Sequence, residues 1–162
     1  MRVRIFTDGA CSENPGPGGW AAVFNTEDKC YTISGNEEST TNNRMELMAV
    51  IKAFEKILKI EYGRKPHAHN EYEIYSDSAY VVNTINNCWI EAWRMNGWKT
   101  TKREDVKNKD LWEKFWELRQ ELNMKRIRFT LIKIKGHAGN TFNELVDKLA
   151  KEESMKAKVG SE

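Results

Sequence analysis

Short apolar runs and polar turns alternate at the start of the chain. Apolar, β-favouring residues gather at 3–6, at 20–24 and at 29–34, and the last two runs lie on either side of the polar turn 25–28. Runs of this length and composition, separated by turn residues, are typical of strands that pair with their neighbours. The pattern predicts a three-stranded antiparallel meander.

The spacing then becomes helical, with two more strands between the helices. Apolar residues recur at i, i+4, i+7 and i+11 in two segments, which is the spacing of a helix with one buried face. These residues are Leu47, Ile51, Phe54 and Leu58 in the first segment and Leu111, Phe115, Leu118 and Leu122 in the second. Strands are predicted at 73–77 and 127–135, a short helix at 78–86 and a last helix around 143–149. This order predicts an α/β fold.

Composition indicates the number of domains and the cellular compartment. A chain of 162 residues with 40% apolar content is the size of one domain, which we predict at residues 1–152, with residues 153–162 as a charged, frayed tail. Cysteines 11, 30 and 88 are odd in number and form no C-x-x-C pair, which indicates free thiols in a reducing compartment, the cytoplasm. No apolar run approaches the length of a membrane span. We expect no membrane association.

Candidate chemistry begins with carboxylates near the ends of predicted elements. The first strand ends on Asp8, where Gly9 and the Pro/Gly-rich stretch 14–19 follow, and the strand 73–77 ends on Asp77 in the same way. In α/β sheets, ligands bind beyond the carboxyl ends of strands. Glu46 lies early in its predicted helix and Asp147 in the last helix. Taken singly, Asp8 also suits a turn cap and Glu46 a partner for the helix dipole.

Four acids that meet at one sheet edge require compensation. Mutual repulsion and burial raise carboxyl pKa values unless a cation neutralises the charges, and oxygen-only ligation suits Mg²⁺ or Mn²⁺. Two such ions about 3.5–4 Å apart support in-line phosphodiester hydrolysis. The pattern therefore predicts a metal-dependent nuclease.

Other features fit this chemistry less specifically. His137, between two glycines, is either a loop residue or an aid to proton transfer or product release. His67 and His69 lie in the polar loop 63–70, where two histidines are more often solvated than metal-bound. Residues 99–109 contain five lysines or arginines against two acids, near three tryptophans. Such a segment suits a nucleic-acid backbone or a solvated surface equally well.

Seven motifs together resemble the cellular type 1 ribonuclease H family (ribonuclease HI), whose members cut the RNA strand of RNA–DNA hybrids. They are Thr7-Asp8-Gly9, the stretch 14–19, Thr41-Asn42-Asn43-Arg44-Met45-Glu46-Leu47, Tyr75-Ser76-Asp77-Ser78, Gly97-Trp98-Lys99, the stretch 135–139 and Asn143-Glu144-x-x-Asp147. The resemblance implies a mixed five-stranded sheet, three strands antiparallel and two parallel, with helices on both faces. It also implies a monomer that binds an RNA–DNA hybrid.

The same resemblance assigns roles to single positions. Asp8, Glu46, Asp77 and Asp147 would hold two Mg²⁺ or Mn²⁺ ions, with His137 as a mobile catalytic residue, and cleavage would leave 5′-phosphate and 3′-hydroxyl ends. Residues implied to contact the RNA strand are Cys11, Asn14, Asn42 and Asn43. Residues implied to contact the DNA strand are Thr41, Asn96 and Trp89. Residues 93–109, here called the protrusion, would grip the hybrid through Trp98, Lys99, Lys102 and Arg103.

Two other function classes fit the same pattern. A non-catalytic hybrid-binding module would use the same fold without needing all four acids. A DNA-cutting nuclease would share the fold and the carboxylates but would need neither the asparagines nor the protrusion. All four acids being present favours the hybrid ribonuclease.

Overall fold

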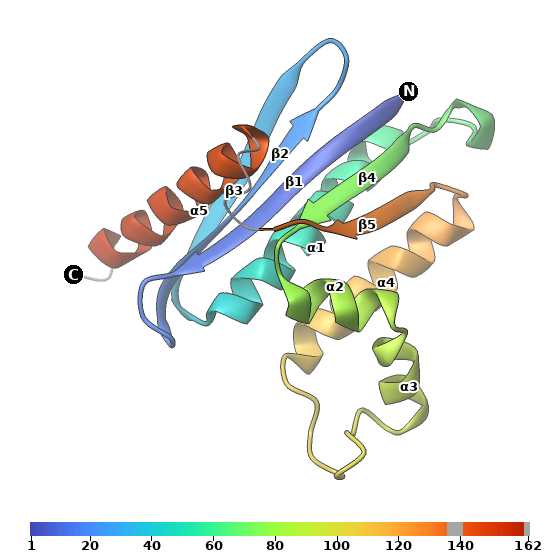
Figure 1. Ribbon diagram of the computed structural model, residues 1–162. Helices are drawn as coiled ribbons and strands as arrows, with labels where there is room; N and C mark the ends of the chain where they lie inside the picture. Colours follow the sequence, from blue (N-terminus) through green and yellow to red (C-terminus); the bar gives the residue numbers. More distant parts are fainter. Residues whose placement is uncertain (136–140, 161–162) are drawn as a thin grey trace.

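The computed structural model describes residues 1–135 and 141–160, which fold around one mixed sheet (Figure 1). The strands are β1 (Arg2–Cys11), β2 (Gly16–Asn25), β3 (Cys30–Thr40), β4 (Glu71–Ser76) and β5 (Phe129–Lys133). Their order in the sheet is β3-β2-β1-β4-β5. The first three strands pair antiparallel, whereas β4 pairs parallel to both β1 and β5. The predicted fold class is confirmed.

Helices cover both faces of this sheet (Figure 1). They are α1 (Asn42–Glu61), α2 (Ala79–Asn86), α3 (Trp89–Met95), α4 (Lys109–Met124) and α5 (Thr141–Gly160), with a short 3₁₀ helix, η1, at Pro66–Ala68. Helix α5 packs on β1, β2 and β3, while α1 packs on the other face of β1 and β2 and against α4. None of the helices in the described part of the chain is long and apolar enough to span a membrane.

The two faces bury two separate apolar cores, because side chains alternate along each strand. The larger core joins Ile5 and Phe24 of the sheet to Phe54 of α1 and Phe115 of α4. The smaller core lies under α5 and centres on Phe6. The spacing that predicted α1 and α4 therefore marks their buried faces, as expected for amphipathic helices.

Two boundaries differ from the sequence predictions. Strand β1 does not stop at Asp8 but continues to Cys11, and Asp8 pairs with Ala21 of β2. Gly16 to Gly19, expected to form a turn, belong to β2. The physical reason lies in the glycines, which serve close helix packing here and not only chain reversal.

The predicted frayed tail also differs. Helix α5 continues to Gly160, and Glu153, Ser154 and Ala157 are buried against the sheet. The Glu153 carboxylate accepts hydrogen bonds from Ser34 Oγ at 3.2 Å and from Asn36 Nδ2 at 2.7 Å. These contacts to β3 hold the charged segment in place.

Candidate active site

Gly9 brings the first two carboxylates together. A Cβ atom at this position would lie 2.3 Å from the Glu46 backbone nitrogen and 2.4 Å from the Met45 carbonyl carbon. Only glycine therefore allows α1 to cross β1 this closely. Asp8 precedes Gly9 in the strand, and Glu46 lies at the crossing point on α1. The close approach sets both acids at one place.

A second glycine has the same function on the opposite face. A Cβ atom at Gly19 would lie 2.4 Å from the Ala150 carbonyl oxygen of α5. Helix α5 therefore packs directly on the backbone of β2, and it carries Asp147 one turn before this contact. Sequence reasoning treated Gly9 and Gly19 as turn residues, because their neighbours in the sequence carry no sign of the helices that pack on them.

Asp77 reaches the site from the adjacent parallel strand. It directly follows β4, which pairs with β1 from Arg2↔Glu71 to Phe6↔Tyr75. The backbone leaves the sheet here, because Ser78 caps α2 by accepting a hydrogen bond from the Val81 N–H at 3.1 Å. Asp77 thus lies at the carboxyl end of a strand, as the sequence predicted.

Asp8, Glu46 and Asp77 form one cluster. Each offers a carboxylate oxygen, and these three oxygens lie within 4.8 Å of one another. Asp8 and Glu46 are each only 5% exposed. Burial, followed by the charge of Asp77, raises the pKa of Asp8 from 3.8 to about 7. Burial and the charges of Asp8 and Asp77 also raise the pKa of Glu46 well above its ordinary value.

The cluster fits a hard divalent cation. Among the described residues, the buried Glu46 Oε2 has no hydrogen-bond partner. A buried, unpartnered carboxylate oxygen is costly unless a cation or a proton satisfies it. Because all three donors are oxygens, Mg²⁺ or Mn²⁺ suits the site better than zinc.

The fourth predicted acid lies beside the cluster. Asp147 is half-buried, and both its hydrogen bonding and its charge contribute to the raised pKa of Asp8. Its Oδ2 atom also lies 3.0 Å from the Lys151 ammonium, one turn further along α5. Asp147 is therefore near Asp8 but outside the group of three. His137 falls in the segment 136–140, outside the described residues.

The residues implied to contact RNA gather where β1 ends and α1 begins. The Asn42 backbone N–H donates to Asn14 Oδ1 at 3.0 Å. The Cys11 thiol donates to the carbonyls of Glu13 at 2.6 Å and Thr40 at 3.5 Å. Cys11, Cys30 and Cys88 are all free, as predicted.

Thr41 and Asn43 complete this region. Thr41 is the N-cap of α1 and accepts a hydrogen bond from the Arg44 N–H at 3.2 Å. Asn42 and Asn43 are exposed at the first turn. The start of α1 thus presents two amide side chains a few residues from Glu46.

The protrusion extends away from the sheet between α3 and α4 (Figure 1). Lys102 and Arg103 are exposed at its loop, and no ion pair involves them within the described ranges. Lys99 differs, since its ammonium is paired with Asp105. Trp98 packs in part against the larger core. Of the three cations expected to contact the hybrid, Lys102 and Arg103 are therefore the two without a carboxylate partner in the described residues.

Two residues assigned to the DNA strand have different surroundings. Trp89 begins α3 and is 43% exposed, so its ring is available for contact. Asn96 follows α3, and its amide donates to the carbonyls of Lys99 at 3.2 Å and Thr100 at 3.5 Å. The Asn96 side chain thus holds the turn of the protrusion.

His69 contradicts the expectation of a solvated loop. Its side chain is 5% exposed, and its Nδ1 lies 2.5 Å from Glu61 Oε2. The buried Glu61 carboxylate also accepts from the Tyr72 hydroxyl at 2.7 Å and pairs with Arg64 at 3.2 Å. His69 therefore fastens the loop to the end of α1, at the far end of that helix from Glu46.

Comparison with known proteins agrees with this geometry. The RNase H family model matches residues 1–155. The Ribonuclease H of Acetivibrio thermocellus is 48% identical over 155 residues, which cover 96% of each chain. That of Syntrophomonas wolfei is 46% identical over 149 residues, covering 92% of this chain and 93% of the relative.

Solved structures show the same fold. LC11-RNase H1, isolated from compost, has a TM-score of 0.69 at 26% identity, covering 96% of this chain and 97% of that one. The same protein in complex with an RNA/DNA hybrid gives 0.69 at 24% identity, covering 96% and 98%. With a family model that spans nearly the whole sequence and relatives of this identity, the chain belongs to the RNase H family.

Proposed function

We propose that this protein is an endonuclease that hydrolyses the RNA strand of RNA–DNA hybrids. The observation that carries the proposal is the cluster of Asp8, Glu46 and Asp77, with oxygens within 4.8 Å of one another, in a member of the RNase H family. A member that only bound hybrids would gain nothing from gathering three like charges, two of them buried. The cluster thus favours catalysis over a non-catalytic binding module.

Asp8, Glu46, Asp77 and Asp147 would hold the metal ions. When bound, two Mg²⁺ or Mn²⁺ ions would activate water and stabilise the leaving oxygen. The chain's own contribution is to fix the carboxylates: Gly9 sets the distance between β1 and α1, and Ser78 turns the chain after Asp77. His137, outside the described residues, is proposed to assist proton transfer or product release.

Selectivity for the hybrid would come from the surface around the cluster. The amides of Asn14, Asn42 and Asn43 can both donate to and accept from a ribose 2′-hydroxyl, the group that distinguishes RNA from DNA. Lys102 and Arg103 would bind phosphates away from the reaction, because such contacts position a duplex without reading its sequence. Trp89 offers an exposed ring at the start of α3.

The test uses matched duplexes of one sequence. RNA–DNA, DNA–DNA and RNA–RNA duplexes, each labelled on one strand at a time, are incubated with Mg²⁺ and with excess chelator. We expect cleavage of the RNA strand of the hybrid alone, only with metal, and products whose 5′ ends a phosphatase can dephosphorylate. Binding without cleavage would identify a hybrid-binding module, and cleavage of DNA–DNA would identify a DNA nuclease.

A further inference from the structure

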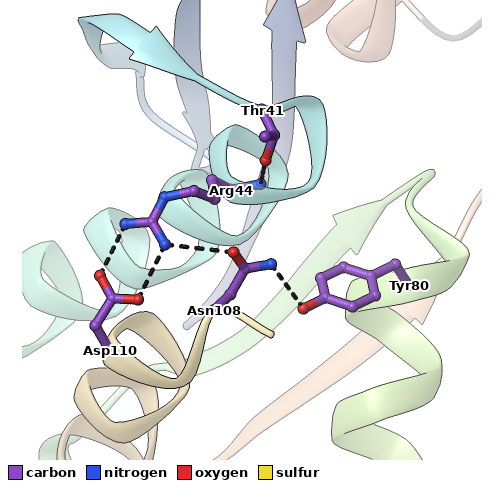
Figure 2. Close-up of polar contacts among 5 residues, drawn as sticks. All are labelled: Thr41, Arg44, Tyr80, Asn108 and Asp110. Carbon is purple, nitrogen blue, oxygen red and sulfur yellow. Dashed lines mark hydrogen bonds and ion pairs between the residues drawn. The ribbon is translucent and has the colours of Figure 1, made fainter. Parts of the chain in front are cut away.

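A network of hydrogen bonds joins α1, α2 and the start of α4 (Figure 2). Arg44 donates from Nη1 and Nη2 to the two carboxylate oxygens of Asp110, at 2.9 and 2.8 Å. Its Nη1 also donates to Asn108 Oδ1 at 3.3 Å. The Asn108 amide in turn donates to the Tyr80 hydroxyl at 3.0 Å, which also accepts from Trp112 Nε1 at 2.8 Å.

Several residues of this network are close in sequence to the acids of the carboxylate cluster or to the protrusion. Arg44 is two residues before Glu46, and its backbone N–H donates to Thr41 (Figure 2). Tyr80 is three residues after Asp77, in the first turn of α2. Asn108 is in the protrusion, and Asp110 directly follows it. The network therefore connects the elements that carry Glu46 and Asp77 to the base of the protrusion.

The geometry is more restrictive than that of an ordinary surface ion pair. Arg44 is mostly covered, with 27% of its side chain exposed, whereas Asp110 is 66% exposed, and both terminal nitrogens of Arg44 engage that one carboxylate. A bidentate guanidinium–carboxylate pair fixes orientation as well as distance. The Arg44 hydrogen bond lowers the pKa of Asp110, which is the change expected when a carboxylate is held as the anion.

Asn108 uses both ends of its amide. Its oxygen accepts from Arg44 and its nitrogen donates to Tyr80, so neither end can turn without losing a bond. Its backbone has a φ of 60°, where asparagine is more readily accommodated than most residues. The chain thus leaves the protrusion and enters α4 in one fixed conformation.

We propose that Arg44, Asn108 and Asp110 form a positioning unit that sets the protrusion at a fixed place relative to the carboxylate cluster. This inference rests on the proposed function, because it concerns how one hybrid reaches both sites at once. Phosphates bound by Lys102 and Arg103 would then hold the RNA strand in register with Asp8, Glu46 and Asp77. Arg44 and Asp110 touch no reacting group and act through the placement of the protrusion.

A double-mutant cycle on hybrid binding tests the proposal. The dissociation constant of a fluorescently labelled RNA–DNA hybrid is measured by anisotropy in excess EDTA. Asp110→Asn, which keeps the size of the side chain and removes its charge, should raise the dissociation constant about 5- to 10-fold, within the usual range of coupling between sites. In the background Lys102→Ala/Arg103→Ala, the same substitution should raise it less than about 2-fold, because the misplaced cations are already absent.

Glu113→Gln is the matched control on the same helix. Glu113 pairs with Lys109 at 3.5 Å, and both side chains are about half exposed, so this pair has neither the covered cation nor the bidentate geometry of Arg44 and Asp110. We expect no change in the dissociation constant in either background. Arg44→Lys is the second variant, since it keeps the charge but loses the bidentate fork, and it should behave like Asp110→Asn.

The outcomes separate positioning from plain stabilisation. If the network only stabilises the fold, Asp110→Asn lowers the melting temperature and its effect on binding is equal in both backgrounds, which overturns the proposal. In cleavage assays, positioning predicts a raised KM with kcat changed less than about 2-fold at saturation. A wild-type protein that binds the hybrid but never cuts it refutes the proposed function, while the binding cycle still decides this inference.

Discussion

The close approach of α1 to β1 requires that residue 9 has no Cβ atom. Because a Cβ atom at residue 9 would overlap the Glu46 backbone nitrogen at 2.3 Å, Gly9→Ala must push α1 away from the strand. We expect a loss of about 1–3 kcal/mol of stability, the usual cost of overpacking a tight contact. Chemical unfolding measures this, and the thermal shift caused by Mg²⁺ should shrink as Glu46 moves.

Gly63→Ala is the control for that prediction. Unlike Gly9, Gly63 has a left-handed backbone that favours glycine, with a φ of 78°, but no atom lies within 4 Å of the position its Cβ would take. Gly63→Ala should then lower the stability only through backbone strain, by about 1 kcal/mol, and the thermal shift caused by Mg²⁺ should be unchanged. If Gly63→Ala reduces the Mg²⁺ shift as much as Gly9→Ala does, close packing at Gly9 is not what places Glu46.

Asp77 allows chemistry and binding to be separated. Asp77→Asn keeps the shape of the side chain but removes a charge that the metal ions would need, while the asparagines and the protrusion remain. We expect cleavage of the hybrid to fall by several orders of magnitude, with the dissociation constant changed by less than about 3-fold. An equal loss of binding and cleavage would place Asp77 in hybrid recognition instead.

At the scale of elements, the protrusion shows that equal charges need not contribute equally. Lys99 is already paired with Asp105, whereas Lys102 and Arg103 are exposed cations. A lysine that exchanges one carboxylate for a phosphate gains less than one that is only hydrated. Lys99 is therefore expected to contribute less to hybrid binding than Lys102 or Arg103.

Salt dependence measures this difference. Lys102→Ala and Arg103→Ala should each flatten the slope of log Kobs against log[salt] by up to about 0.9 if each cation neutralises one phosphate. Lys99→Ala should change the slope less. The slopes come from anisotropy titrations at several salt concentrations. Equal flattening by all three would mean that the Lys99 pair opens when the hybrid binds.

For the molecule as a whole, periodicity and motif position predicted most of the architecture. The helical spacing located α1 and α4, and the strand predicted at 73–77 placed Asp77 correctly at a strand end. These features are local, because a buried helix face or a strand end shows in neighbouring residues. The contacts that sequence reasoning missed join residues of different segments of the chain.

Three of these contacts illustrate why. Gly9 was expected to start a turn, since nothing in its own neighbourhood shows that α1 crosses there. His69 was expected to be solvated, whereas its side chain contacts Glu61, the last residue of α1. Asp110 was not singled out from the sequence, yet it binds Arg44 of α1. Each required knowledge of which segments meet in space.

The last prediction concerns the stability of the metal-free protein. The folded pKa of Asp8, about 7, lies above the ordinary value of 3.8 that the unfolded chain would have. Between these pH values the folded state binds the proton more tightly, so stability falls as pH rises through this window and the full penalty is present above pH 7. Neutralising Asp8 should remove that penalty.

Asp8→Asn in excess chelator at pH 8 should therefore melt above wild type, by about 2–4 °C for each kcal/mol of repulsion relieved. Wild type should gain stability from pH 8 to pH 6 more steeply than the variant, because only wild type takes up the Asp8 proton there. With Mg²⁺, wild type should gain stability by mass action and the variant should lose most of that gain. If the variant melts at or below wild type, other bonds hold the carboxylates and their charges do not destabilise the fold. If Mg²⁺ raises both melting temperatures equally, Asp8 is not a metal ligand.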